Sequence, residues 1–386
     1  MFTRKSQVVF LFFVWIAVHL VIFRYLGIRQ LYDSKGYIAA ADYFLAEQSL
    51  QDVHHVFYVV PILLLAFTRF IFGDTVVPFL ILQILTSGFA MVALYRTAVK
   101  VFKVQEAGFF SVLLFLLWWD NIQWNTAVLT ESLFCSLTIL ILYVVVSSNR
   151  NLGYYVAVAS MAAILLLTRP TAVVVIVGIV GYGLAENWRM IGNKVWKIRI
   201  VFVVLAAVSF AAASLMFDHW DFTEQYVEGN IVTYMNSIEG SELYRESLRL
   251  STDELILPDP EEPSIIKIIT FVYQNPIHFL SAFFLKIGYL ITGVRPYYSS
   301  IHNGFMLIWM IVIYFLFFLG VKAQKLPNTR LLAFTIICVN CLLVGISTVD
   351  WDNRFYVPMQ PVIVLMAAGG ASQIYHRIIK SLEAWR

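Results

Sequence analysis

The stretch MFTRKSQVVFLFFVWIAVHLVIF, residues 1–23, places two basic residues before a long apolar run. This is the pattern of a signal sequence, but no clear small-residue cleavage site follows, so we interpret it as a retained first span. Apolar runs of similar length recur almost from end to end of the chain. A helix of about 20 such residues crosses the hydrocarbon core of a bilayer.

The composition agrees with a membrane protein. Of 386 residues, 60% are hydrophobic and 13% are charged, whereas soluble domains are roughly half apolar and a quarter charged. Because backbone groups in lipid must satisfy their own hydrogen bonds, we expect an all-α polytopic bundle. The ten expected spans are residues 8–23, 77–96, 106–119, 129–147, 153–168, 171–186, 198–216, 304–321, 331–348 and 358–375.

On this map of spans, the basic residues gather in every second connection, which places them on one side of the membrane. With Arg4 and Lys5 in the cytoplasm, every short connection on that side is basic, and so is the C-terminal tail. The positive-inside rule therefore predicts that both termini are cytoplasmic. The low cysteine count and compact size favour a bacterial inner membrane, with the chemistry on its outer side.

Two apolar segments fit poorly as spans. Residues 57–73 contain Pro61 and Arg69, and residues 275–293 contain His278 and Lys286. Counting either segment alone as a span would invert the basic connections that follow it. We therefore expect both to be helices at the outer interface, where basic side chains can snorkel.

The map leaves two outer segments in a single transmembrane domain, residues 1–386. The first is residues 24–75. The second, residues 217–303, begins with an acidic stretch that has twelve carboxylates but only Arg245, Arg249 and Lys267 before residue 268. This excess fits a solvated loop face, or else a site for a cation or a basic acceptor.

Other classes of site find little support. A net charge of +3 is too small to indicate nucleic acid, and we expect none as a partner. Cys135, Cys338 and Cys341 all lie in apolar runs, where a thiol packs as a small hydrophobe, so they indicate neither a redox pair nor a zinc site.

Asp33 stands out in QLYDSKGYIAAADYF, residues 30–44. After it, Tyr37, Ala40, Ala41, Phe44 and Leu45 follow the spacing of one helix face. Asp33 or Ser34 would then cap an interfacial helix. Capping explains the residue type, and a catalytic role for Asp33 is the alternative.

More ionisable residues lie close to the outer ends of expected spans, where charge is costly and is a mark of function. Asp120 and Glu131 flank a short aromatic turn. Glu131 also opens its helix, so capping competes with function there. Arg169 lies at a proline-broken junction and is expected to pair with a carboxylate or a phosphate. The segment STVDWDNRFYVPMQP, residues 347–361, contains Asp350, Asp352, Arg354 and Tyr356.

Four stretches, taken in order, resemble the GT-C superfamily of integral membrane glycosyltransferases, which includes protein O-mannosyltransferases and the lipid A aminoarabinose transferase. They are YDSKGYIAAADYFL (32–45), AVLTESLFCSLTILIL (127–142), ILLLTRPTAVVV (164–175) and NRFYVPMQPVIVLMAAGG (353–370). NPIHFLSAFFLKIG (275–288) is similar to the interfacial helix of such proteins. One departure is DVHHVFYVVP (52–61), where many relatives have a His-Pro-Pro-type motif and this chain has His54 and His55 with no adjacent proline.

The resemblance implies an inverting transfer of a sugar from a polyprenyl-phosphate donor to a glycan, lipid or protein acceptor at the outer face. Asp33 would accept the proton of the acceptor hydroxyl. Arg354 would hold the departing phosphate, with Arg295, Lys286 and Arg169 in reserve. Glu131 would orient the acceptor or a divalent cation. The expected substrate contacts are Tyr37, His54, His55, Asp120, Asp352 and Tyr356.

No cofactor is certain, and a divalent cation stays open. His54 and His55 fit either metal ligands or ordinary interfacial histidines. A transporter or flippase of lipid-linked sugars is the main alternative function, although no repeated halves are visible. A polysaccharide polymerase would need lipid-linked oligosaccharides on both the donor and the acceptor side. A non-catalytic scaffold would need neither Asp33 nor Arg354.

Overall fold

The computed structural model describes residues 4–147, 150–187, 203, 207, 226–233 and 248–385. This part of the chain is helical, with three isolated β-bridges and no strand. The expected span at 198–216 falls almost wholly outside it, as do half of the twelve carboxylates of the acidic stretch. The helices before that gap are α1 (Arg4–Leu26), α2 (Tyr32–Glu47), η1 (Val53–Tyr58), α3 (Val59–Phe72), α4 (Val77–Phe102), α5 (Gln105–Leu117), α6 (Trp119–Ile122), η2 (Gln123–Thr126), α7 (Glu131–Ser147), α8 (Leu152–Leu166) and α9 (Ala172–Asn187).

The helices after the gap form the second half of the bundle. They are α13 (Ser264–Gln274), α14 (Pro276–Thr292), α15 (Ser300–Ala323), α16 (Pro327–Ile346), η5 (Arg354–Tyr356) and α17 (Gln360–Ala384). All nine expected spans in the described residues coincide with a helix. Five of these helices are long and apolar enough to cross a membrane, whereas α5, α7, α8 and α9 have only 13 to 17 residues.

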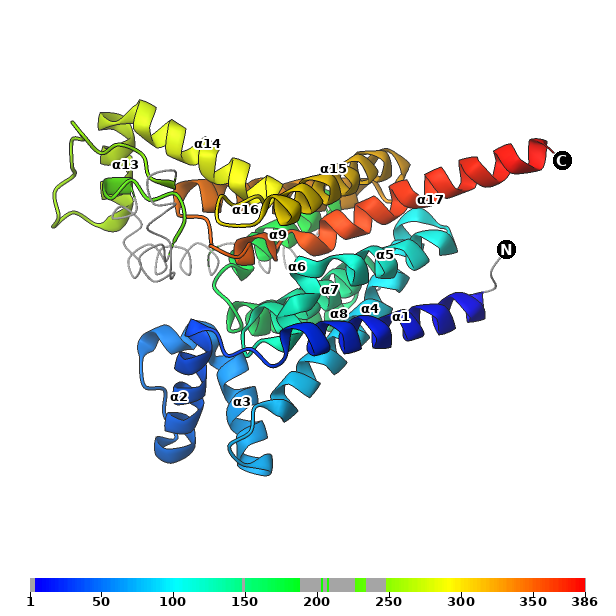
Figure 1. Ribbon diagram of the computed structural model, residues 1–386, viewed down its shortest axis with the longest axis horizontal. Coiled ribbons are helices and arrows are strands. Elements are labelled where there is room, and N and C mark those ends of the chain that lie inside the picture. Colours follow the sequence, from blue (N-terminus) through cyan, green and yellow to red (C-terminus); the bar gives the residue numbers. More distant parts are fainter. Residues whose placement is uncertain are drawn as a thin grey trace.

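Contacts at helix ends show that the spans run between two common ends of the bundle. Lys100 Nζ, near the end of α4, donates to the carbonyl of Ser147 at 2.7 Å, and the Lys325 amide donates to the Val101 carbonyl at 2.9 Å. These contacts join the ends of α4, α7 and α15. Both chain termini lie at this end, and we call it the terminal end (Figure 1). The opposite end, which carries α2, α13 and the loop after α16, is called the site end.

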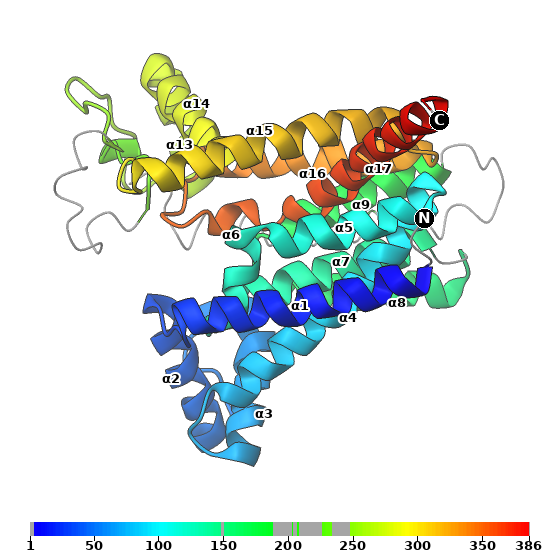
Figure 2. The ribbon, with the colours of Figure 1, turned by 45° about the vertical axis from the view of Figure 1, so that its right-hand side comes forward.

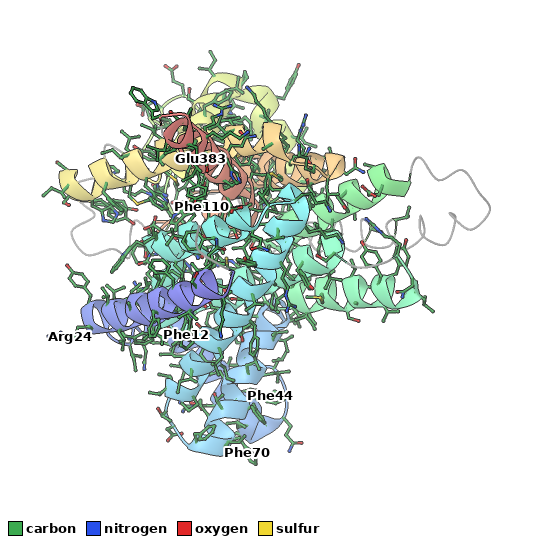
Figure 3. All side chains as sticks on the ribbon, turned by 90° about the vertical axis from the view of Figure 1, so that its right-hand side faces the viewer. Phe12, Arg24, Phe44, Phe70, Phe110 and Glu383 are labelled. Atoms are coloured by element: carbon green, nitrogen blue, oxygen red, sulfur yellow. The ribbon has the colours of Figure 1, made fainter. Side chains whose placement is uncertain are left out.

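The helices α2 and α3 project crosswise from the bundle, away from α1 (Figures 1 and 2). Seen along the bundle, Phe44 and Phe70 mark the tip of this projection, well apart from Phe110 of α5 (Figure 3). Arg69 of α3 is paired with Asp42 of α2 at 2.7 Å and with Asp74 at 3.2 Å. The segment Val53–Phe72 is long and apolar enough to cross a membrane, and it lies crosswise to the bundle, so the interfacial position of residues 57–73 stays a prediction.

The second outer segment is anchored to the loop after α16. α13 and α14 meet at a bend of 111°. The Thr233 amide donates to the Val349 carbonyl at 2.8 Å, and the Val349 amide donates to Ile231 at 3.3 Å. Residues 226–233 therefore hold the start of the loop that carries Asp350 and Arg354.

The closest helix packing is between α15 and α17. A Cβ atom at Gly320 would clash with the carbonyl of Met366, and one at Gly370 would clash with the carbonyl of Leu316. Small residues allow helix backbones to approach in this way inside a membrane. α17 is buried from Gln360 to Gly370, so its first half is fixed on the bundle.

Candidate active site

Two arginines and two carboxylates from four separate stretches meet at the site end. Arg354 donates through Nε to Glu131 Oε1 at 2.5 Å, and its Nη1 lies 2.6 Å from Asp33 Oδ2. Arg169 pairs through Nη1 with the same Glu131 oxygen. We call Asp33, Glu131, Arg169 and Arg354 the charged quartet. Its formal charges cancel, which allows four ionised groups to share a poorly solvated place.

The two carboxylates of the quartet differ in access. Glu131 is the first residue of α7, and its side chain is fully buried behind the two arginines. The Asp33 side chain keeps 30% of its surface exposed. Within the quartet, Asp33 is therefore the carboxylate that solvent reaches, whereas Glu131 pairs with both arginines. The role of Glu131 in orienting the acceptor stays a prediction, and its carboxylate is buried in this structure.

The capping hypothesis for Asp33 and Ser34 is wrong. The N-cap of α2 is Leu31, which makes no side-chain cap, and Asp33 lies in the first turn with its carboxylate on Arg354. The predicted apolar face is correct for Tyr37, Ala40 and Ala41, which are buried. α2 thus uses one face to pack and presents Asp33 to the neighbouring loop.

The chain reaches α2 through a short anchored connection. Gly27 has a φ of +64°, which ends α1 in a left-handed turn that glycine adopts without strain. Arg29 then donates through Nη2 to the Gln123 carbonyl at 2.8 Å and through Nε to Thr126 Oγ1 at 3.1 Å. These bonds tie the first loop to the turn that leads into Glu131, and so set Asp33 relative to the arginines.

A cavity of about 310 Å³ opens beside the quartet, within the size range of small-molecule sites. Its wall combines the first loop, the junction after α8 and the segment around η5. The lining residues are Asp33, Gly36, Tyr37, His54, His55, Tyr58, Arg169, Pro170, Thr171, Thr233, Asn340, Leu343, Val344, Ser347, Thr348, Asp350, Arg354 and Phe355. Both arginines of the quartet and Asp33 therefore face one space.

Three of the expected substrate contacts lie on this wall: Tyr37, His54 and His55. The two imidazole centroids are 6.4 Å apart, and His54 lies edge-on to Tyr58 at 5.1 Å. Within the described residues, no group of three or more histidine, cysteine or acidic side chains is arranged to hold a metal ion. His54 and His55 both line the cavity.

Arg295 and Lys286, the reserve phosphate ligands, are used elsewhere. Arg295 is fully buried and donates to the backbone carbonyls of Tyr289, Val294 and Asp350 and to Asn353 Oδ1. Lys286 is also buried, donates to the Ser347 carbonyl at 2.7 Å and lies 3.6 Å from the Tyr226 ring centroid. Neither lines the cavity, and both hold the loop in which Arg354 lies.

Asp120, Asp352 and Tyr356 also lie outside the cavity lining. Asp120 accepts from Asn353 Nδ2 at 3.3 Å, and Asp352 accepts from the Tyr298 hydroxyl at 2.9 Å. The Tyr356 hydroxyl is 2.9 Å from that of Tyr314, in the core. These residues support the loop before α17 and do not contact the space beside Asp33.

Asp352 makes the stability of this loop depend on pH. Burial, reinforced by the Asp120 carboxylate, raises the pKa of Asp352 from 3.8 to about 7. The folded chain therefore holds this proton more tightly than the unfolded chain, so its contribution to stability is full below about pH 4 and is lost as pH rises through 7.

We expect the melting temperature of Asp352→Asn, measured relative to that of wild type, to be higher at pH 8 than at pH 5, because the amide has no proton to lose. Equal melting temperatures of the two proteins at both pH values would contradict this, and exposed Asp259→Asn is the control.

The sequence did not single out Asn340 and Thr171, which line the cavity. Asn340 lies in α16, is 1% exposed and donates to the Phe355 carbonyl at 2.9 Å. A lone amide inside an apolar span is costly to bury, and this cost could have identified Asn340 as a candidate functional residue. Thr171 directly follows the Arg169-Pro170 junction, so its place beside Arg169 in the sequence could have identified it.

Comparison with known proteins gives one family match. Residues 58–212 match the family model described as dolichyl-phosphate-mannose-protein mannosyltransferase. No curated protein matches the chain. Among solved structures, ArnT from Cupriavidus metallidurans bound to undecaprenyl phosphate is similar with a TM-score of 0.41 and 12% identity, over 96% of this chain and 78% of ArnT.

The family match carries the conclusion, because the structural likeness is too weak to add to it. The matched residues include the Thr-Glu motif at Glu131 and the Thr-Arg-Pro junction at Arg169. In the structure these two motifs meet the first-loop Asp33 and the late Arg354. Apolar helices make the chain a multi-pass membrane protein, and the match over residues 58–212 supports the resemblance to GT-C glycosyltransferases drawn from the motifs.

Proposed function

We propose that the protein transfers a sugar from a polyprenyl-phosphate donor to a hydroxyl of a glycan, glycolipid or protein acceptor, with inversion at the anomeric carbon. The observation that carries the proposal is the position of Arg354, which joins the half-buried Asp33 to the fully buried Glu131 at the cavity. One wall of this space thus offers a base and a phosphate ligand together.

Each group has one task in the proposed reaction. The acceptor oxygen forms a bond to the anomeric carbon while Asp33 takes its proton. The bond between that carbon and the phosphate oxygen breaks, and its electron pair leaves with the polyprenyl phosphate. Arg354 and Arg169 stabilise the charge that grows on the phosphate. Glu131 keeps both guanidinium groups in place and does not touch the acceptor.

Donor binding would also prepare the base. Arg354 uses Nε for Glu131 and Nη1 for Asp33, and a guanidinium has five N–H donors. A phosphate that docks on the remaining donors competes with Asp33 for the same positive charge. The carboxylate is then less tightly held and can turn to the acceptor hydroxyl, so the base becomes available only when the donor is bound.

The position of the cavity relative to the membrane would let both substrates reach it. The cavity lies at the site end, opposite to both termini, and α2 and α3 project beside it (Figure 2). If the termini are cytoplasmic, as the basic connections predict, the cavity lies at the outer face of a bacterial inner membrane. A lipid-linked donor would reach it from the bilayer and the acceptor from the outer side.

The direct test is transfer by the purified protein. Wild-type protein in nanodiscs is incubated with a panel of radiolabelled polyprenyl-phosphate sugars and a membrane extract, and labelled product and free polyprenyl phosphate are measured together. Transfer with release of lipid phosphate supports the proposal. No consumption of any donor, combined with movement of lipid-linked sugar across the bilayer, would establish the transporter alternative.

The role of Arg354 predicts a specific loss. We expect Arg354→Ala to lower kcat/KM for the lipid donor by about 10²–10³-fold, the usual effect of removing a ligand of the developing charge. Arg150→Ala is the matched control, because Arg150 pairs with Glu186 at the terminal end at 3.7 Å. Unchanged donor binding together with an unchanged rate in Arg354→Ala would remove this residue from the site.

A further inference from the structure

A second cavity, of about 490 Å³, lies between α1, α4 and α5. Its wall on α4 runs from Leu85 to Arg96, which corresponds to about 16 Å at the rise of an α-helix. On α1 it begins at Val8 and ends at Trp15, so it lies in the half of the bundle near the termini. We call it the α1–α4 groove. The charged quartet is at the other end, and the two cavities share no lining residue.

The α1–α4 groove is apolar along its length and basic at one end. The side chains of Phe12 and Phe89 on its wall are 56% and 70% exposed, so the protein itself does not cover them. In Figure 3, Phe12 marks the α1 side of this region. The lining contains no carboxylate. Arg96 is exposed, and no described residue forms an ion pair or hydrogen bond with it.

We propose that the α1–α4 groove binds one anionic phospholipid, with an acyl chain along α4 and its phosphate head group on Arg96. A long apolar slot that ends at Arg96, which has no ion-pair partner among the described residues, is complementary to an anionic amphiphile with an acyl chain and a phosphate. Basic residues at the cytoplasmic ends of membrane helices attract anionic head groups in the same way. The site is separate from the proposed transferase chemistry.

Other occupants fit these observations less well. A two-fold contact with a second copy across this groove would bring two Arg96 side chains together with no acidic partner on the wall, and like charges repel. A polyprenyl phosphate has the same two chemical features as the phospholipid, but its proposed reaction is at the opposite end of the bundle. We therefore propose the phospholipid as the occupant. The test below also detects a second copy of the chain or a polyprenyl phosphate.

Lipid in this groove would act on α1. Only 22% of the apolar window of this helix is buried in the protein, so α1 depends on what fills the space beside it. Gly88 leaves the groove open opposite Trp15, since a Cβ atom there would lie 3.6 Å from the indole ring. α1 leads through Gly27 to Arg29 and Asp33, so the bound lipid would stabilise the helix that positions the first loop.

The test measures thermal stability of delipidated full-length protein in detergent. Phosphatidylglycerol and phosphatidylcholine with identical acyl chains are titrated, and native mass spectrometry counts bound lipids. We expect phosphatidylglycerol to raise the melting temperature at a concentration at least tenfold lower than phosphatidylcholine, because a ligand that binds only the folded state stabilises it. Arg96→Gln should remove this preference. Lys103→Asn, a change of a basic residue outside the groove, should keep it.

A second pair of variants tests the groove without changing charge. Gly88→Leu should block the stabilisation by either lipid, whereas Gly88→Ala should retain it. Equal effects of the two lipids on wild type, or a preference that survives Arg96→Gln, would overturn the proposal. A dimer without lipid in the mass spectrum would overturn it, as would displacement of phosphatidylglycerol by polyprenyl phosphate at Arg96. All of these readouts are independent of sugar transfer, so they stand even if the proposed function fails.

Discussion

Asp33→Asn should lower the turnover of sugar transfer by about 10²–10⁴-fold, the range expected when a general base is removed. The asparagine amide has nearly the same size but cannot take a proton from the acceptor. Arg354 still has Glu131 as a partner, so we expect the donor to bind almost as tightly as before. The predicted effect is thus on kcat, and single-turnover transfer with saturating donor measures it.

Two further variants separate base chemistry from structure. Asp33→Glu keeps a carboxylate on a longer side chain and should recover part of the rate. Asp42→Asn lies on the same helix, where its carboxylate is 47% exposed and pairs with Arg69, and it should retain wild-type turnover. Near-normal transfer by a folded Asp33→Asn protein would show that another group accepts the proton.

Glu131→Gln should cost the fold about 3–5 kcal/mol, which is the usual penalty for removing one partner of a buried ion pair. Glu131 is fully buried, and its carboxylate serves both Arg169 and Arg354. Without it, Arg169 has no direct ion pair with a carboxylate among the described residues, and its side chain is only 5% exposed. We expect a large drop in melting temperature, and loss of transfer follows from misplaced arginines.

Glu106→Gln is the matched control for this experiment. Glu106 also lies in the first turn of a helix, α5, and is 3.5 Å from His376 with part of its side chain exposed. Such an exposed pair contributes at most about 1 kcal/mol, so stability should hardly change. If Glu131→Gln were as stable as wild type, the arginines would not depend on Glu131, and its proposed role would be wrong.

The sequence predicted the helices well because a long apolar run by itself indicates a helix that is buried in the membrane or the protein. It also identified each member of the charged quartet, since an ionisable group beside hydrocarbon is costly and must have a partner. It could not predict which of these ionisable side chains pair with one another. Arg354 and Arg295 look alike in sequence, yet one binds two carboxylates and the other binds mainly backbone carbonyls. Carbonyl groups are present at every residue, so no pattern marks those that an arginine will reach.

The same limit explains the other differences. Asp120, Asp352 and Tyr356 lie near Arg354 in the fold, but they point to Asn353, Tyr298 and Tyr314 and away from the cavity. For Asp352 and Tyr356, direction depends on the turn around Asn353, which has a φ of +58°. Asn adopts this left-handed conformation more readily than most residues, but its presence does not tell where the neighbouring side chains will point.

The close packing of α15 on α17 has a consequence for movement. Arg354 lies six residues before α17, whose first half is held against α15 by backbone contact at Gly320 and Gly370. Packed cores shift between discrete arrangements and do not deform smoothly. Arg354, close to this packed helix, is therefore expected to stay in place when a substrate binds. α2 and η1 project from the bundle, so we expect any opening or closing of the cavity to move Asp33 relative to Arg354.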